Sequence, residues 1–169
     1  MDDSKLTLRS FELADAEHIA LLANNKSIWI NLRDAFPYPY SQEDAVQFIE
    51  KCQKMNPQSV FAIIYNNELC GSIGIFQMQD VYRKSAEIGY WIGEQYWGKG
   101  IASKAVEKIV QYGFANMDIV KIFAGIFSNN MASHRVLEKN GFVKEAVLKN
   151  AVFKNGKLLD EHRYSLLKS

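Results

Sequence analysis

The residues with the clearest chemical potential lie in Gln95–Ala102, the stretch Gln-Tyr-Trp-Gly-Lys-Gly-Ile-Ala. Gly98 and Gly100 lack a Cβ, so the backbone there can adopt positive φ and a ligand can approach its amides closely. An apolar run precedes the stretch and a run of helical period follows it, which predicts a strand–turn–helix junction. The first turn of a helix has N–H groups without intrahelical partners, and Lys99 adds a positive charge. The stretch therefore predicts a site for phosphate groups.

Two common phosphate-binding motifs match this stretch only in part. Gly93 and Gly98-Lys99 have the spacing of a P-loop, but Gly100 stands where that motif has its Mg²⁺-binding Ser or Thr. Gly98 and Gly100 begin a dinucleotide fingerprint, but Ser103 replaces the third glycine and no βαβ unit precedes it. Two alternatives stay open at this point: a nucleotide-binding protein with an imperfect P-loop, and a turn whose glycines serve only geometry.

Two motifs together resemble those of the GCN5-related N-acetyltransferases. Gln95–Ala102 is similar to their pyrophosphate loop, Gln/Arg-x-x-Gly-x-Gly/Ala. Asn130–Phe142, with the pattern Asn-x-x-Ser-x-Arg-Val-Leu-Glu-Lys-x-Gly-Phe, is similar to their second signature. The opening Leu6–Arg9 and the stretch Glu87–Gly93 further resemble the branch that acetylates ribosomal-protein N-termini. The resemblance covers essentially the whole chain.

The resemblance implies an enzyme that transfers an acetyl group from acetyl-CoA directly to a primary amine in a ternary complex. Such an enzyme must hold the thioester beside a neutral amine, stabilise the oxyanion and protonate the thiolate. An α-amino group, with a pKa of ~8, loses its proton more easily than lysine at ~10.4. The resembled branch implies a protein N-terminal α-amine, such as that of a ribosomal protein. A small-molecule amine acceptor (a polyamine or an amine antibiotic) and a non-catalytic CoA-binding regulatory module are the alternatives.

The resemblance also implies which residues contact acetyl-CoA. The pyrophosphate would lie on the backbone amides that follow Gln95, and the pantetheine arm would pair with the backbone of the preceding strand. The residues expected to contact acetyl-CoA are Tyr90, Trp91, Ile92, Gln95, Gly98, Lys99, Gly100, Ile101, Ala102 and Asn130. Asn130 either caps its helix or hydrogen-bonds the pantetheine, since its amide has both donors and an acceptor.

Glu87 is the candidate general base. It is an acid within an otherwise apolar strand, on the face shared with Gly89 and just upstream of the phosphate-binding stretch. Partial burial would raise its pKa towards a useful range. The resemblance places a glutamate base on this strand, acting through a water. A solvent-exposed glutamate at a sheet edge is the alternative.

Ser133 is the candidate acid for the departing thiolate. Many relatives use a tyrosine in this helix, but Leu137 stands at the matching position here. In the resembled branch the serine has this role. A serine hydroxyl is a weak acid, so its contribution is chiefly a hydrogen bond to the thiolate. A helix serine bonded to local backbone is the alternative.

The segment 29–40 is unusually aromatic, and its two prolines disfavour a regular helix. Aromatic side chains with polar tips suit a substrate pocket, and the resembled family places its acceptor site near the loop between its first two helices. The candidate acceptor-binding residues are Trp29, Asp34, Phe36 and Tyr38. Closure of the core edge by the aromatic residues is the alternative. An acidic pocket around Asp34 and Glu87 would favour a polycation, and an open groove would favour a peptide.

Composition and charge narrow the remaining classes. The net charge of +1, from 20 basic and 19 acidic residues, gives no reason to expect nucleic acid or an anionic membrane as a partner. His18, His134 and His162 are dispersed without metal-binding spacing, so no metal is expected. Cys52 and Cys70 are expected to be free thiols, and the acidic N-terminus is unlike a signal peptide, so a cytoplasmic location is predicted. The protein is expected to be a monomer or a homodimer.

The pattern of apolar residues predicts a single α/β (α+β) domain over residues 1–169. Strands are predicted over 5–9, 60–65, 69–76, 83–92, 121–126, 143–153 and 157–167, and helices over 15–24, 41–55, 101–114 and 130–140. Asn66-Asn67 and Asn155-Gly156 are expected to form hairpin turns, and Ser41 is expected to cap a helix in a capping box with Asp44. The result is a mixed, mostly antiparallel, twisted sheet of about seven strands flanked by about four helices, the layout of the resembled family.

Overall fold

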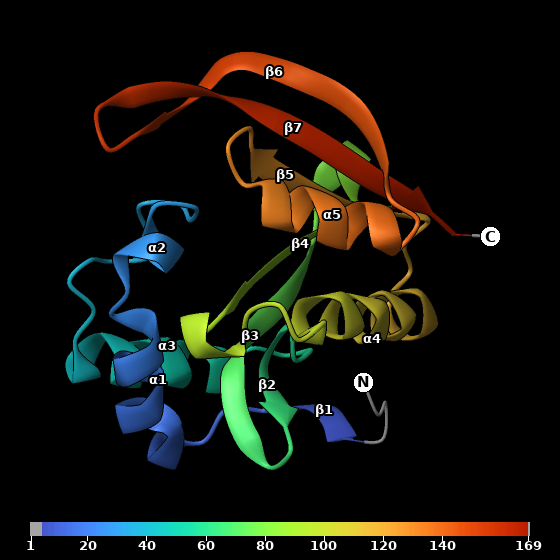
Figure 1. Ribbon diagram of the computed structural model, residues 1–169. Helices are drawn as coiled ribbons and strands as arrows, with labels where there is room; N and C mark the ends of the chain where they lie inside the picture. The colour runs from blue at the N-terminus through green and yellow to red at the C-terminus, as the bar shows by residue number, and fades with distance from the viewer. Residues whose placement is uncertain (1–4, 169) are drawn as a thin grey trace. The chain divides into compact units, whose positions relative to one another are not determined.

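The computed structural model describes residues 5–168 and contains the alternating strands and helices that the sequence predicts (Figure 1). The strands are β1 (Leu6–Arg9), β2 (Val60–Tyr65), β3 (Glu68–Gln77), β4 (Ser85–Ile92), β5 (Lys121–Phe127), β6 (Val143–Lys154) and β7 (Lys157–Leu167). The α-helices are α1 (Ala16–Ala23), α2 (Lys26–Trp29), α3 (Gln42–Gln53), α4 (Ile101–Asn116) and α5 (Met131–Lys139). Short 3₁₀ turns lie at Leu13–Asp15, Asp80–Tyr82 and Glu94–Tyr96.

The strands form one seven-stranded mixed sheet in the order β1-β2-β3-β4-β5-β7-β6. The pairs β1–β2, β2–β3, β5–β7 and β6–β7 are antiparallel, and β4–β5 is parallel. The predicted fold class is thereby confirmed. The chain divides into two compact units. The first contains the described residues up to Gly74 together with Tyr90–Ala105, and the second contains Ile75–Gly89 and the chain from Val106 onward. A single domain over residues 1–169 stays a prediction.

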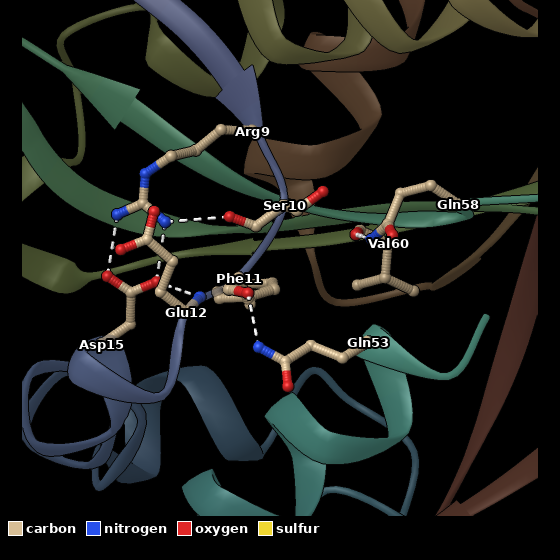
Figure 2. Close-up of polar contacts among 8 residues, drawn as sticks. All are labelled: Arg9, Ser10, Phe11, Glu12, Asp15, Gln53, Gln58 and Val60. Carbon is tan, nitrogen blue, oxygen red and sulfur yellow. Dashed lines mark hydrogen bonds and ion pairs between the residues drawn. The ribbon is translucent and has the colours of Figure 1, made fainter. Parts of the chain in front are cut away.

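In the first unit, an ion pair fixes the way the chain leaves β1. The two terminal guanidinium nitrogens of Arg9, Nη1 and Nη2, donate to the Asp15 carboxylate at 2.7 and 2.8 Å (Figure 2). Burial alone would raise the pKa of Asp15, but the bonds from Arg9 and from the Glu12 N–H outweigh it and lower that pKa. The connection therefore leads into α1, whose inner face buries Ile19 and Leu22.

Local capping signals are confirmed in this unit. The Ser41 side chain accepts a hydrogen bond from the Asp44 amide, and the Asp44 carboxylate accepts one from the Ser41 amide. Asn66 and Asn67 have φ of 52° and 64°, the left-handed values that a tight hairpin turn needs. One helix was missed: α2 covers Lys26–Trp29, between the predicted helix over 15–24 and segment 29–40. Asn25 caps α2 by accepting from the Ser27 and Ile28 amides.

In the second unit, α4 and α5 cover one face of β5 and β7. A Cβ added at Gly113 of α4 would meet the Ile122 side chain at 3.3 Å, and the His134 ring of α5 packs beside Tyr164 of β7. In Figure 1, α5 lies alongside β7. Asn155 and Gly156 turn the chain from β6 into β7 with φ of 49° and 76°, as predicted. The strand predicted from residue 83 begins at Ser85 instead, because Asp80–Tyr82 forms a 3₁₀ turn that Arg83 closes.

The two cysteines are buried free thiols, 1% and 0% exposed for Cys52 and Cys70. Burial raises the pKa of each to about 11, so roughly one thousandth of each thiol is ionised at pH 8. We expect no reaction with a disulfide reagent such as DTNB in the native protein at pH 8, and release of two equivalents after denaturation. Rapid labelling of the native protein at either position would contradict this burial.

Candidate active site

The predicted phosphate-binding stretch belongs to the first unit, where backbone contacts hold its start in place. The Gly93 amide donates to the Cys70 carbonyl at 2.8 Å. The Trp97 indole N–H donates to the Ile92 carbonyl, also at 2.8 Å. These bonds tie the 3₁₀ turn between them to the end of β4, so the following glycines start from a fixed position.

Both glycines of the stretch have the conformation that was expected of them. Gly98 and Gly100 have φ of +73° and +76°, and a Cβ added at either would meet no heavy atom within 4 Å. Helix α4 begins immediately afterwards at Ile101. Open space beside two left-handed glycines at the start of a sixteen-residue helix fits a pyrophosphate, whose oxygens accept hydrogen bonds from backbone amides.

Polar contacts around Tyr96 set the position of Lys99. The Lys99 ammonium lies 5.3 Å from the centroid of the Tyr96 ring, within the range of a cation–π interaction. The Tyr96 hydroxyl donates to the Glu68 carboxylate at 3.1 Å. Burial first, and then this bond to Glu68, raise the pKa of Tyr96, while a hydrogen bond with Gln95 opposes the rise. Gln95 and Lys99 thus both contact the tyrosine that anchors the stretch.

The aromatic residues proposed to bind the acceptor gather in the same unit. Phe36 packs edge-on against Trp91 of β4, with ring centroids 5.7 Å apart. Trp29 and Tyr38 are 5.6 Å apart, and Tyr38 is 43% exposed. Asp34 is also exposed. The fold therefore joins segment 29–40 to the strand that was expected to bind pantetheine, and it leaves part of that segment facing solvent.

Glu87 lies in the second unit, at the end of the parallel ladder between β4 and β5. The ladder pairs Ser85 with Lys121 and ends where Glu87 pairs with Phe123. Ala86 and Ile88, which flank Glu87, are buried, whereas Glu87 itself is half-buried. Its carboxylate is therefore on the sheet face opposite the one that α4 and α5 cover. Ile88 and Gly89 follow outside this ladder.

A second carboxylate and a cation lie on that same face, and sequence reasoning missed both. Gly125 pairs with Arg163, and a Cβ added at Gly125 would meet the Glu161 carboxylate at 2.7 to 2.9 Å. Arg163 donates to Glu161 at 2.8 Å, and its guanidinium lies 5.3 Å from the centroid of the Phe123 ring. The alternation of side chains along β7 was the available signal. Which of them lie on the same sheet face as Glu87 depends on the register in which β7 pairs with β5.

Asn130 and Ser133 lie together at the start of α5, also in the second unit. The Asn130 side-chain oxygen accepts from the Ser133 amide at 3.2 Å, so Asn130 caps the helix. The cap uses only the oxygen and leaves the amide N–H groups outside it. Ser133 is half-buried, whereas Leu137 is fully buried. A side chain at position 137 is therefore inside the core, and the role of Ser133 stays a prediction.

Among residues 5–168, no group of three or more His, Cys, Asp or Glu side chains is arranged to hold a metal ion. No helix in the same range is long and apolar enough to cross a membrane.

Comparison with known proteins identifies the family. Residues 5–143 match the model of the acetyltransferase (GNAT) domain. The chain belongs to the GNAT family. It is 33% identical, over 97% of its length and 93% of the relative's, to the uncharacterized N-acetyltransferase p20 of Bacillus licheniformis.

Two solved structures of GNAT enzymes show how widely acceptors vary. RimL, a ribosomal L7/L12 alpha-N-protein acetyltransferase in complex with coenzyme A, superposes with a TM-score of 0.86. It is 25% identical over 97% of this chain and 94% of its own. Spermidine N-acetyltransferase from Vibrio cholerae, in complex with CoA and spermine, has a TM-score of 0.81. It is 28% identical over 97% of this chain and 96% of its own.

The protein is thus an acetyl-CoA-dependent N-acetyltransferase, as predicted. The nucleotide-binding and non-catalytic alternatives are set aside. The comparisons do not separate a protein α-amine from a small amine such as spermidine, because relatives of both kinds are about equally similar. The roles of individual site residues stay predictions.

Replacing Gly100 with alanine tests the phosphate-binding role. At φ of +76° an alanine costs roughly 1–2 kcal/mol, and its Cβ would fill the open space beside the amides. We expect the dissociation constant for acetyl-CoA, measured by calorimetry, to rise about tenfold or more. Gly156→Ala is the matched control, because Gly156 has the same φ and also has no neighbour within 4 Å, but lies in the β6–β7 turn. Equal affinity in both variants would contradict the role.

Proposed function

We propose that this enzyme acetylates the N-terminal α-amine of a protein, with Glu87 as general base and Ser133 as the hydrogen-bond donor to the departing thiolate. Bound acetyl-CoA supplies an activated acetyl thioester. The amides from Gly98 to Ala102 hold its pyrophosphate, with Gln95 and Lys99 beside them, and the backbone of Tyr90–Ile92 pairs with its pantetheine arm. This assignment is supported by the left-handed glycines and by the family match.

Glu87 has the task of producing a neutral amine. At neutral pH an α-amine, with a pKa of ~8, is mostly an ammonium without a lone pair. The Glu87 carboxylate accepts the proton through a water, and the amine nitrogen then forms the new N–C bond. A backbone N–H of β4 donates to the acetyl oxygen as negative charge develops there. The position of Glu87 at the end of the β4–β5 ladder supports this role, because Ile88 and Gly89 beyond it are outside the ladder.

Ser133 acts where the C–S bond of the thioester breaks. As the C–S bond breaks, the sulfur gains negative charge, and the Ser133 hydroxyl donates a hydrogen bond to it. Proton transfer to the sulfur completes the exchange. The cap by Asn130 holds the first turn of α5, while its amide N–H groups outside the cap are available to the pantetheine. The half-buried position of Ser133 supports access to a ligand.

One observation favours a single α-amine over a polyamine. The sheet face that carries Glu87 also carries Glu161, but Arg163 pairs with Glu161 at 2.8 Å. The cation of Arg163 offsets the negative charge of Glu161. A polyamine with several positive charges would gain more from carboxylates without such a cation. The part of the acceptor peptide that follows the reacting amine would lie among Trp29, Asp34, Phe36 and Tyr38. An exposed aromatic loop suits a peptide.

An acceptor panel tests this proposal. We would measure CoA thiol release with acetyl-CoA and four acceptors: a peptide with a free N-terminal serine, the same peptide with a blocked N-terminus and one lysine, spermidine, and spermine. The free α-amine peptide is expected to react at least about tenfold faster than the others at pH 7.5, because its pKa is the lowest. Faster acetylation of spermidine would overturn the proposal and favour the polyamine reading.

The same proposal places the reaction in the cytoplasm. Free buried thiols at Cys52 and Cys70 suit a reducing compartment. Fractionation of cells that express a tagged chain tests this, and enrichment outside the cytoplasm would contradict it.

A further inference from the structure

A chain of hydrogen bonds in the second unit ties the start of α5 to β7, and it runs from the buried residues His134 and Tyr164 to the exposed residue Glu138. His134, one residue after Ser133, is 4% exposed, and its Nδ1 lies 3.2 Å from the hydroxyl oxygen of Tyr164. The Tyr164 hydroxyl donates to the Glu138 carboxylate at 3.0 Å. Tyr164 itself is 1% exposed. The chain of hydrogen bonds thus starts and ends on α5 and passes through β7, so it anchors the helix at two successive turns.

The direction of each bond follows from the chemistry of the groups. A carboxylate only accepts, so the single hydroxyl proton of Tyr164 points at Glu138. The Tyr164 oxygen must then accept from His134, which places the ring proton on Nδ1. Burial, and then the bond to Glu138, raise the pKa of Tyr164 to about 12, so the phenol keeps its proton. The hydrogen bonds therefore run in one direction: His134 donates to Tyr164, and Tyr164 donates to Glu138.

The other ring nitrogen of His134 does not provide a second anchor. Within residues 5–168 the Nε2 atom is buried and has no hydrogen-bond partner. The carbonyls of Phe127 and Ser128 face the ring and favour its charged form, but burial, and then the charge of His162, dominate and lower the pKa of His134. Lys144 acts in the same direction. The neutral ring has its centroid 4.8 Å from that of His162, and its Nδ1 contacts the Tyr164 hydroxyl.

This anchor fixes the rotation of α5 about its axis. The His134 amide donates to the Asn130 carbonyl at 3.2 Å, so His134 is in the first hydrogen-bonded turn, the turn that contains Ser133. Consecutive residues of an α-helix are rotated by about 100°, so a fixed His134 determines where the Ser133 hydroxyl points. A rotation of even a few tenths of a turn would move that hydroxyl away from a ligand.

We propose that His134 is a positioning residue for acetyl transfer, which orients Ser133 by hydrogen-bonding Tyr164 of β7 and, through it, Glu138. This inference rests on the proposed role of Ser133. It does not make His134 a catalytic residue, because its Nδ1 contacts Tyr164 of β7 and adjacent residues of a helix do not share a face.

Three variants separate positioning from plain stability. His134→Ala removes the donor, Tyr164→Phe removes only the hydroxyl, and His134→Asn keeps an N–H near the position of Nδ1. We expect kcat to fall about tenfold in the first two variants, with a KM for acetyl-CoA within about twofold of wild type, and to recover to within about threefold in His134→Asn. The double variant is expected to lose no more than either single variant, because both break the same bond.

Hydrogen exchange of the peptide that covers residues 128–140 gives a readout without turnover. Faster exchange in His134→Ala and Tyr164→Phe, and protection restored in His134→Asn, is the expected result. Unchanged kcat, a kcat loss without faster exchange, or failure of His134→Asn to recover, would each overturn the inference. If the wild-type enzyme acetylated no amine in the panel, the proposed function would fail, while the exchange data would still decide whether this chain holds α5.

Discussion

Glu87→Gln is expected to lower kcat by roughly 100-fold or more at pH 7 while the affinity for acetyl-CoA stays within about twofold of wild type. The amide keeps the size of the side chain but cannot accept the proton of the amine. The loss should shrink as pH rises past ~8, because the α-amine then loses its proton to solvent and needs no base. Initial rates from pH 6 to 9.5, with acetyl-CoA affinity from calorimetry, measure both parts.

Glu50→Gln is the matched control for this substitution. Glu50 is an exposed residue of α3, so the same change of charge should leave kcat and its pH profile as in the wild type. A Glu87→Gln enzyme with the wild-type rate at every pH would sink the assignment of the base. A loss of equal size at pH 6 and pH 9.5 would also contradict it, since that pattern indicates altered packing.

Gly71→Ala is expected to destabilise the protein by about 3 kcal/mol and to lower its melting temperature by roughly 10 °C. Gly71 is buried in β3, and an added Cβ would fall well inside the van der Waals contact distance of the Trp91 carbonyl oxygen and 3.0 Å from Ile92 Cα. Both atoms belong to the backbone of β4 and cannot swing aside as a side-chain end could. The strand segment proposed to bind pantetheine must therefore move, so weaker acetyl-CoA binding is expected as well.

Gly89→Ala is the matched control for stability. Gly89 lies in β4, has no positive φ, and a Cβ there would meet nothing within 4 Å, so alanine should leave the melting temperature unchanged or raise it slightly. Thermal melts of the two variants in the absence of ligand give the comparison. Similar melting temperatures for Gly71→Ala and wild type would mean that β3 and β4 separate more easily than their contact indicates.

Features encoded by neighbouring residues were predictable. Gly98 and Gly100 were expected to adopt left-handed φ, and both do. The capping box of Ser41 and the turn at Asn155-Gly156 were also confirmed. Each depends on a few consecutive residues. Either their side chains hydrogen-bond the local backbone, or a glycine without a Cβ leaves the backbone free to adopt positive φ. The missed helix α2 had such a signal too, in the cap by Asn25.

Contacts between distant segments were not predictable. His134 and His162 were taken as dispersed, yet their rings are 4.8 Å apart and Tyr164 joins the same cluster. Glu161 lies across Gly125 because β5 and β7 pair in one particular register, and a shift of one residue would place it on the opposite face.

The family, the sheet of seven strands and the shape of the phosphate-binding turn were predictable from the residues alone, because these follow from two motifs, from periodicity and from local backbone chemistry. The pairing of Arg163 with Glu161 on the sheet face of Glu87, and the contact between Tyr164 and His134, became known from the folded structure alone. Strand register and helix packing bring such residues together, and both are set by burial summed over the whole fold, which no short stretch of sequence contains.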